Sequence, residues 1–314
     1  MNRVDEIADK YSSRSIESKS KWYSPSAIDY DKGRPEYPAG VIADVISKAN
    51  INATSKILEI GSGPGTATQH FSEIGCTIDC IEPNPDFVRI AQHHYKDHLN
   101  IRIHQSSFEE YEHKSELADI VLAGTSFHWV NKQIAFEKSS RLMSDSGYLV
   151  LLWNNELQPN ENSREEVQSV YKRYAPELYP SESESELLDR FDSIGQWISD
   201  TSLFQSPFAG SCVSSVNYTA QRYINALKSY SPYLKLDSET QNNLFFELTS
   251  LINEKYNGAI NLNLVSGYHI AEKAIQGTRS DANYAALRLR RTVGSLYLKS
   301  TDCKNVRISV RGAC

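Results

Sequence analysis

Three features that would assign this chain to a class at once are missing from its sequence. No apolar run approaches the roughly 20 residues that a membrane-spanning helix needs, and the first residues, MNRVDEIADKYSS, lack the apolar core of a secretion signal. The five cysteines are scattered, and their one close pair, Cys76 and Cys80, has no second pair to complete a zinc site. These absences predict a cytoplasmic protein with reduced thiols, no bound metal and no membrane partner.

Positive charge is scarce over most of the chain. The 314 residues include 33 Lys and Arg against 39 Asp and Glu, a net charge of −6. Residues 276–314 hold eight of the basic and two of the acidic residues (+6), which leaves −12 for residues 1–275. An acidic body disfavours a nucleic-acid partner. The basic extension, with RLRR at 288–291, is either a partner arm or a segment without a catalytic role, and we expect the second, outside the core fold.

Against these absences stands a regular alternation of short apolar runs and helix-like segments. The apolar runs are KILEI (56–60), TIDCIE (77–82), IRIHQ (101–105), ADIVLAG (118–124) and GYLVLLWN (147–154). Strands that alternate with helices of this length predict an α/β fold, a doubly wound, Rossmann-like and mostly parallel sheet with helices on both faces. Right-handed crossovers then bring the C-terminal ends of these strands to one edge.

A glycine-rich turn follows the first of these strands. In LEIGSGPG, Gly61, Gly63 and Gly65 lead from the strand toward a helix, an arrangement that presents backbone N–H groups to a ligand. A dinucleotide fingerprint needs Gly or Ala at the sixth position, but Thr66 stands there, which favours a ligand without a pyrophosphate. Glu82, at the end of the next strand, is spaced to accept hydrogen bonds from ribose hydroxyls.

Several of these segments resemble the motifs of a known family. LEIGSGPG, IEPNP, ADIVLAGTSFHWV and RLMSDSGYLVLLWN resemble successive motifs of the class I S-adenosylmethionine-dependent methyltransferases. SFHW, the N-terminal YDKGRPEYP and the later YSPYLKLDSETQNNL are similar to the branch that includes trans-aconitate methyltransferase-like enzymes. The resemblance spans roughly residues 28–275. It implies S-adenosylmethionine as cofactor and in-line methyl transfer to a small-molecule acceptor, whether carboxylate, hydroxyl or amine.

The resemblance also implies an architecture. One methyltransferase domain would cover residues 1–275, built on a seven-stranded sheet whose last strand is antiparallel. A helical insertion at 155–203 would cover the active site. Within it, SESESE at 181–186 is either a solvated loop or the start of a helix.

Carried over by position, the resemblance implies a set of cofactor contacts. The three glycines would line the methionine and ribose portions, with Glu59 nearby as the acid at the strand end, and Glu82 would hold the ribose hydroxyls. The remaining implied contacts are Pro83, Ser107 and Phe108 at the adenine, and the backbone of Ala123 and Gly124 beneath the methionine part. Two segments depart from the family pattern: SSFEE replaces an acid-rich stretch at the adenine, so the alignment at Ser107 can slip by one residue, and DSG replaces PGG before the fifth strand.

Methyl transfer needs no nucleophile on the protein, because alignment and the exclusion of water lower most of the barrier. His128, after the fourth strand, is a candidate base or hydrogen-bond donor to the acceptor, or else an anchor of its own loop. Arg34 is a candidate clamp for a carboxylate of the cofactor or the acceptor, or else an ordinary surface arginine. The candidate acceptor-binding residues, with packing or strand capping as the alternative, are Tyr30, Trp129, Trp153, Asn154 and the adjacent Asn155.

Two other functions stay open at the level of sequence. A nicotinamide-dependent oxidoreductase would use a similar glycine turn and is disfavoured by Thr66. A non-catalytic or nucleic-acid-associated protein with the same fold is disfavoured by the acidic body.

Overall fold

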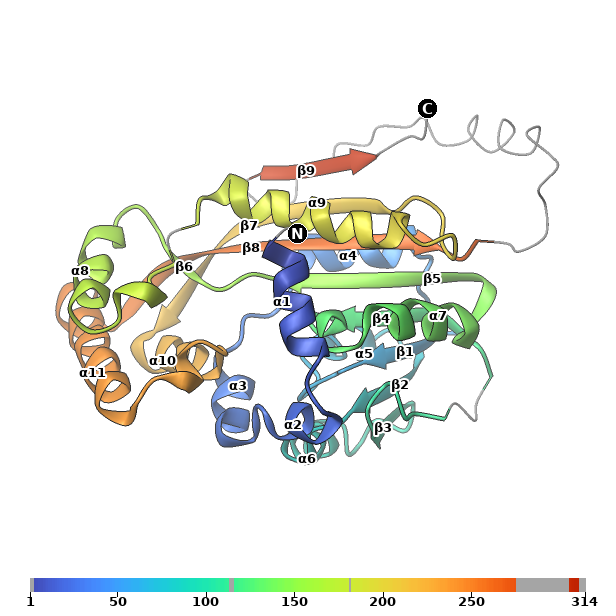
Figure 1. Cartoon of the computed structure of the whole chain (residues 1–314), viewed down its shortest axis with the longest axis horizontal. Helices are drawn as coiled ribbons and strands as arrows, with labels where there is room; N and C mark the ends of the chain where they lie inside the picture. Colours follow the sequence, from blue (N-terminus) through green and yellow to red (C-terminus); the bar gives the residue numbers. More distant parts are fainter. Residues whose placement is uncertain (1–2, 113–115, 181, 275–304, 311–314) are drawn as a thin grey trace.

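One mixed β-sheet forms the centre of the molecule, and helices cover both of its faces (Figure 1). The structure is a computed structural model that describes residues 3–112, 116–180, 182–274 and 305–310. Over these residues the strand order is β3-β2-β1-β4-β5-β8-β7-β9, with the short β6 paired to β8. Within the same ranges, no helix is both long and apolar enough to cross a membrane.

The first five strands are parallel, and their bounds follow the apolar runs closely. They are β1 (Lys56–Ile60), β2 (Thr77–Glu82), β3 (Ile101–Gln105), β4 (Ala118–Gly124) and β5 (Met143–Asn154). The first four have the predicted bounds, whereas β5 begins four residues earlier than predicted. Met143 pairs with Ala118 ahead of an irregularity in the register, so the strand extends back through the polar DSG segment.

The antiparallel strands complete the predicted fold. β8 (Ala259–Glu272) lies between β5 and β7 (Phe208–Thr219) and is antiparallel to both, while β6 (Gln158–Pro159) pairs with its first half. A doubly wound, mostly parallel sheet with an antiparallel last strand is therefore confirmed. The predicted number of strands, seven, is wrong: the described residues form nine, because the short β6 and the edge strand β9 were not expected.

Part of the basic extension joins the sheet. β9 (Asn305–Val310) pairs antiparallel with β7 at the edge of the sheet (Figure 1). Residues 275–304 and 311–314, which include RLRR, lie outside the described residues, so the domain boundary at 275 stays a prediction. Cys76 and Cys80 are free and buried, but Cys212 on β7 is disulfide-bonded. This corrects the expectation of reduced thiols, which rested on spacing along the chain and not on proximity in space.

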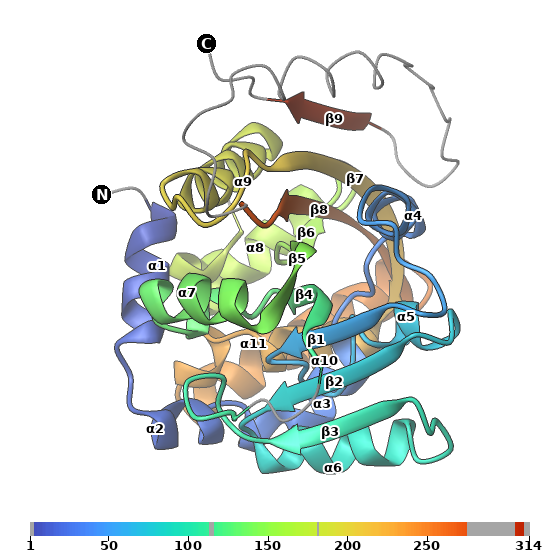
Figure 2. The same cartoon turned by 90° about the vertical axis from the view of Figure 1, so that its right-hand side faces the viewer.

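Helices pack on the two faces in separate groups (Figure 2). One face carries α1 (Arg3–Ser12), α7 (Lys132–Leu142) and α9 (Glu184–Ser199), and the other carries α4 (Ala39–Lys48), α5 (Gln69–Ser72) and α6 (Pro85–His94). Alternate residues of β1 serve the two cores: Leu58 and Ile60 belong to the first, and Ile57 belongs to the second. The strand reads as continuously apolar because both of its faces are covered.

A third core surrounds the C-terminal end of β7 and the N-terminal half of β8. It is built from α8 (Arg164–Tyr174), α10 (Ala220–Ser229) and α11 (Ser238–Lys255). The remaining short helices are α2 (Ile16–Lys21), η1 (Ser24–Ser26), α3 (Ala27–Gly33), η2 (Phe127–Trp129), η3 (Pro176–Leu178) and η4 (Tyr233–Lys235).

The insertion at 155–203 is mainly helical, and its acidic run starts a helix. Ser183 caps α9: its Oγ accepts a hydrogen bond from the backbone N–H of Glu186 at 3.3 Å, and the Glu186 carboxylate accepts one from the Ser183 N–H at 2.7 Å. This reciprocal pair is a capping box, which fills two of the hydrogen-bond positions left open at a helix N-terminus. Of the two interpretations of SESESE, the helix start is the one observed.

We expect Ser183→Ala to lower the free energy of unfolding by about 1 kcal/mol, because the first turn of α9 loses its side-chain cap. Urea denaturation would measure the loss. Ser199→Ala, at the exposed end of the same helix, is the matched control and should change stability much less. Equal losses in the two variants would contradict a stabilising role for the capping box.

Candidate active site

A cavity of about 560 Å³ lies at the C-terminal ends of the parallel strands. Its walls include Gly63 after β1, Glu82 at the end of β2, Gly124 at the end of β4 and Trp153 near the end of β5. The N-terminal helices and the insertion contribute the remaining walls. Its volume falls in the range of pockets that bind small organic ligands.

The glycine turn and Glu82 are joined by hydrogen bonds. The Glu82 carboxylate, which is buried, accepts one from the Gly63 N–H at 2.8 Å and another from the Asn84 N–H at 2.7 Å. Gly63 has a φ of +59°, which favours glycine, and no atom lies within 4 Å of the place where its Cβ would stand. The main chain at Gly63 therefore faces open space, where a ligand can approach it closely.

The other two glycines serve close packing of the protein itself. A Cβ on Gly61 would lie 2.8 Å from the Cβ of Ser126, and a Cβ on Gly65 would lie 2.4 Å from the ring of Tyr95. The Tyr95 hydroxyl also donates to the Gly65 carbonyl at 2.8 Å. Gly61 borders the cavity, whereas Gly65 lies behind its wall.

Glu59 and Ala123 also lie behind the wall. The Glu59 carboxyl accepts a hydrogen bond from the Thr68 hydroxyl at 2.7 Å and is 1% exposed. Burial raises the pKa of Glu59 to about 8, the charge of Glu82 raises it further, and the hydrogen bond from Thr68 acts in the opposite direction. Glu59 thus supports the glycine turn from below, and the direct cofactor contacts implied for Glu59 and Ala123 stay predictions.

The predicted adenine-binding residues all border the cavity: Pro83, Ser107 and Phe108. The Ser107 hydroxyl donates to the Glu110 carboxylate at 3.0 Å, so its side chain is already engaged. Asn84, beside them, was missed by the sequence analysis. Its Oδ1 caps α6, while its buried Nδ2 has no partner among the described residues. The sequence carried a signal for this residue, because Asn84 directly precedes the proline at which α6 begins and is therefore placed to cap that helix.

Arg34 is held between aromatic rings at the edge of the cavity. Its Nε donates to the Ser229 hydroxyl at 2.7 Å and its Nη2 donates to the Ser229 carbonyl at 2.6 Å. Its guanidinium carbon lies 4.5 Å from the ring centre of Tyr30 and 4.0 Å from that of Tyr230. Its Nη1 has no hydrogen bond to a described residue, so this fixed cation retains a donor for an anionic ligand.

His128 lies among aromatic side chains. Its ring centre is 5.6 Å from that of Tyr11, 5.9 Å from that of Trp129 and 5.6 Å from that of Trp153. Its Nδ1 is buried and has no partner in the described chain. Burial lowers the pKa of His128 to about 4, and the positive charge of Arg34 contributes. The imidazole is therefore neutral near pH 7, able to form hydrogen bonds but a weak base.

Asn154 ties two walls of the cavity together. Its Nδ2 donates to the carbonyls of Pro35 and Glu36 at 3.1 and 3.2 Å, and its Oδ1 accepts from the Ser266 hydroxyl. The residue predicted to contact the acceptor thus holds the segment after Arg34 against the end of β5.

The N-terminal helices cover the cavity through contacts that the sequence could not indicate. The ring of Tyr11 packs against that of Trp129, with ring centres 4.4 Å apart and a 40° angle between the ring planes. The Asp5 carboxylate accepts hydrogen bonds from Lys132 Nζ at 2.6 Å and from the indole N–H of Trp197 at 2.8 Å. These partners lie more than 100 residues apart in the chain, so no local pattern relates them.

We expect the stability of the protein to fall as the pH rises from about 5 to 8, in part because of Glu59. Its pKa is higher in the folded chain than the usual 4.5, so the folded state holds one more proton between pH 4.5 and about 8. This contribution is complete below pH 4.5 and is lost as the pH rises through 8. Glu59→Gln should reduce the fall in unfolding free energy by a few kcal/mol, on the order of 3.

Urea denaturation at both pH values would measure this effect. Glu73→Gln, which removes an exposed carboxyl, is the control and should leave the pH dependence unchanged. The assignment fails if Glu59→Gln and the unaltered chain lose the same stability between pH 5 and 8.

Comparisons with known proteins agree with this geometry. Residues 58–151 match a family described as a methyltransferase domain. An uncharacterized methyltransferase-like protein of Schizosaccharomyces pombe is 28% identical over 135 residues, which are 43% of this chain and 52% of that protein. Ribosomal RNA small subunit methyltransferase A of Pseudomonas putida is 36% identical over 69 residues, which are 22% of this chain and 26% of that protein. The matched residues thus span about half the length of the first relative and about a quarter of the length of the second.

The fold itself has a counterpart among solved structures. A candidate type II methyltransferase from Anaeromyxobacter dehalogenans superposes with a TM-score of 0.52 at 14% identity, covering 76% of this chain and 97% of that one. The narrower resemblance to the trans-aconitate methyltransferase-like branch stays a prediction. Residues 58–151 thus match a methyltransferase domain, and the strand order and the glycine turn facing Glu82 agree with the resemblance to the class I S-adenosylmethionine-dependent methyltransferases.

Proposed function

We propose that this protein transfers a methyl group from S-adenosylmethionine to a carboxylate group of a small molecule. The observation that carries the proposal is the single cavity in which an open glycine turn beside Glu82 faces an arginine clamped between two tyrosines. The first half suits an adenosyl ligand and the second suits an anion.

The residues at the glycine turn fit the cofactor. Glu82 offers a carboxylate to ribose hydroxyls, Gly63 leaves room for a ligand against the main chain, and the unpaired Nδ2 of Asn84 offers a donor. When bound, S-adenosylmethionine supplies an electrophilic methyl group on a positively charged sulfur. The Gly63 N–H already bonds a carboxylate, which makes it a poor site for the phosphates of a dinucleotide.

The acceptor half favours a group that is already nucleophilic. A phenol or alcohol needs a base with a pKa near neutral, and the pKa of His128 is about 4. A carboxylate needs no deprotonation, only orientation, and the Nη1 of Arg34 offers a donor for it. Neutral His128 can orient the acceptor by a hydrogen bond, and the covering helices keep water away from the reacting atoms.

A polynucleotide acceptor is the alternative that the relative from Pseudomonas putida raises. The walls of this cavity carry five glutamates against four basic residues, and the N-terminal helices lie over it. A phosphate backbone is attracted by surfaces with an excess of positive charge, which these walls lack. The cover and the mixed charge of the walls both support a small molecule.

We expect Gly63→Val to weaken S-adenosylmethionine binding by about 100-fold or more, because a branched side chain would strain a left-handed residue and fill the space beside Glu82. Isothermal titration calorimetry would measure this. Gly75→Val is the matched control, since Gly75 has a φ of +89° and its Cβ would meet only Ala53 Cβ, at an ordinary 3.8 Å, but Gly75 does not border the cavity. Normal binding by Gly63→Val would show that the cofactor is misplaced.

We expect radiolabelled S-adenosylmethionine to label carboxylic acids in a metabolite panel, giving methyl esters that base hydrolyses to volatile methanol. Arg34→Ala should lower kcat/KM by about 100-fold, and His128→Ala by about 10-fold or less, since a neutral ring only orients the acceptor. Arg222→Ala, which removes an arginine stacked on Tyr218 outside the cavity, is the control. Label that resists base, on an amine or a phenol, would contradict a carboxylate acceptor.

A further inference from the structure

We propose that the indole N–H of Trp153 and the side-chain amide of Asn155 form a second polar subsite, which binds an uncharged carbonyl oxygen of the methyl acceptor. The identity of this ligand as the acceptor rests on the proposed function. The two donors would bind the far end of a molecule whose carboxylate lies at Arg34.

Both donors are buried, unpaired and at the cavity. Trp153 is 7% exposed and Asn155 is 9% exposed, and both border the cavity. Trp153 Nε1 and Asn155 Nδ2 have no hydrogen-bond partner in the described part of the chain. A buried N–H without a partner costs free energy, and most such groups in proteins are satisfied. A ligand oxygen between them would remove this cost.

Strand geometry places the two side chains together. The Asn155 N–H donates to the Val265 carbonyl at 3.0 Å, so the pairing of β5 with β8 continues one residue past the end of β5. Residues i and i+2 of an extended segment lie on one face, so Trp153 and Asn155 share a face and Asn154 lies on the other. This alternation explains why the amide of Asn154 bonds the backbone of Pro35 while that of Asn155 has an unpaired donor.

The surroundings of Asn155 determine which end of its amide is available. Arg190 Nη1 donates to Asn155 Oδ1 at 3.4 Å, which turns Nδ2 away from the arginine. Arg190 also forms an ion pair with Glu182, so its charge is already balanced, and Glu156 borders the same cavity. Both donors are neutral and the charge of Arg190 is balanced, so this subsite favours a neutral carbonyl oxygen, while Arg34 in the wall of the same cavity is the cation for an anion.

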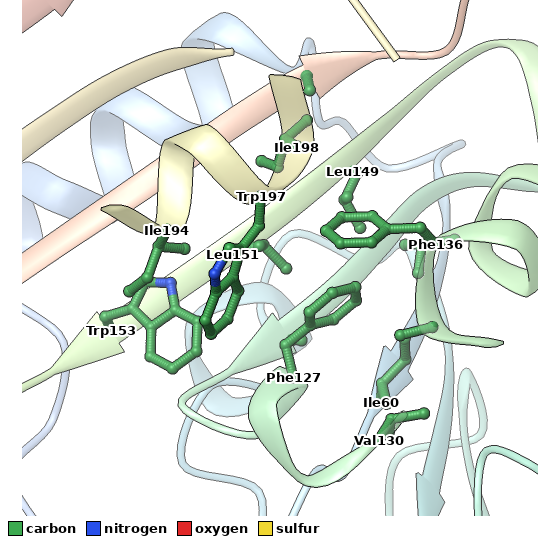
Figure 3. Packing of buried hydrophobic residues seen from close by; sticks show 14 of the residues in the cluster. Ile60, Phe127, Val130, Phe136, Leu149, Leu151, Trp153, Ile194, Trp197 and Ile198 are labelled. Carbon is green, nitrogen blue, oxygen red and sulfur yellow. The ribbon is translucent and has the colours of Figure 1, made fainter. Parts of the chain in front are cut away.

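The subsite is well separated from the cofactor half. Strands β1 and β4 lie between β2, which carries Glu82, and β5. Three strand spacings amount to about 14 Å. Figure 3 shows Trp153 beneath α9 beside Ile194 and Trp197. The indole N–H of Trp197 donates a hydrogen bond to Asp5, whereas that of the neighbouring Trp153 has no partner among the described residues.

This difference provides the test. In the full-length chain labelled with ¹⁵N-tryptophan, each indole N–H gives its own NMR resonance, and Trp153→Phe identifies that of Trp153. Titration with N,N-dimethylacetamide, which accepts but does not donate hydrogen bonds, should move the Trp153 resonance downfield and leave that of Trp197 in place. A Trp153 resonance that does not move, or moves no more than that of Trp197, would overturn the proposal.

Two further arms sharpen the result. Asn155→Leu should raise the dissociation constant for dimethylacetamide about 5-fold and change the free energy of unfolding little. It removes an unpaired buried donor, while the bond it takes from Arg190 is long, at 3.4 Å, and Arg190 stays paired with Glu182. Acetate should move the Trp153 resonance less than dimethylacetamide does, and a larger effect of acetate would show that the subsite binds anions instead. Unchanged dimethylacetamide binding by Asn155→Leu would remove Asn155 from the subsite.

The same sample separates this proposal from the proposed function. If the chain binds dimethylacetamide at Trp153 but not S-adenosylmethionine, the methyltransferase proposal fails and the carbonyl subsite stands. If it binds S-adenosylmethionine but dimethylacetamide does not reach Trp153, only the subsite fails.

Discussion

The pair of hydrogen bonds that the Glu82 carboxylate accepts from Gly63 and Asn84 is the contact on which the rest of the site depends. It joins the turn after β1 to the start of α6, and so fixes both walls of the cofactor half at once. Burial raises the pKa of Glu82 to about 7, although the two hydrogen bonds lower it. The buried negative charge is therefore energetically unfavourable in the absence of further donors. Hydroxyl groups of a ligand would add donors and stabilise the carboxylate.

The acceptor half is assembled differently, from segments that are distant in the chain. Arg34 is oriented by Ser229, nearly 200 residues later, and Asn154 reaches back to the segment that follows Arg34. The helices before Arg34 are tied to the insertion through Asp5 and Trp197. Separate contacts of one N-terminal segment therefore cover the cavity and orient the arginine.

Three polar groups in this half are buried and neutral, namely Nδ1 of the His128 ring, the indole N–H of Trp153 and the side-chain amide of Asn155. His128 loses its charge among aromatic rings, and Trp153 and Asn155 keep donors without partners. In surroundings of low polarity a single hydrogen bond discriminates strongly, because a ligand that fails to make it leaves a buried donor unpaired. The protein would therefore select its acceptor by the positions of its oxygen atoms as well as by the charge that Arg34 attracts.

The sequence by itself determined the first four parallel strands and the position of Glu82 opposite the glycine turn, because short apolar runs and the spacing across one βαβ unit are local properties. Only the tertiary structure decided that Gly65 and Glu59 lie behind the wall, that His128 is neutral, and that Asn155 presents an unpaired donor to the cavity where its neighbour Asn154 ties the walls. The reason is physical: burial, and with it the pKa of a group and the partners it is left without, depends on which distant segments pack around it.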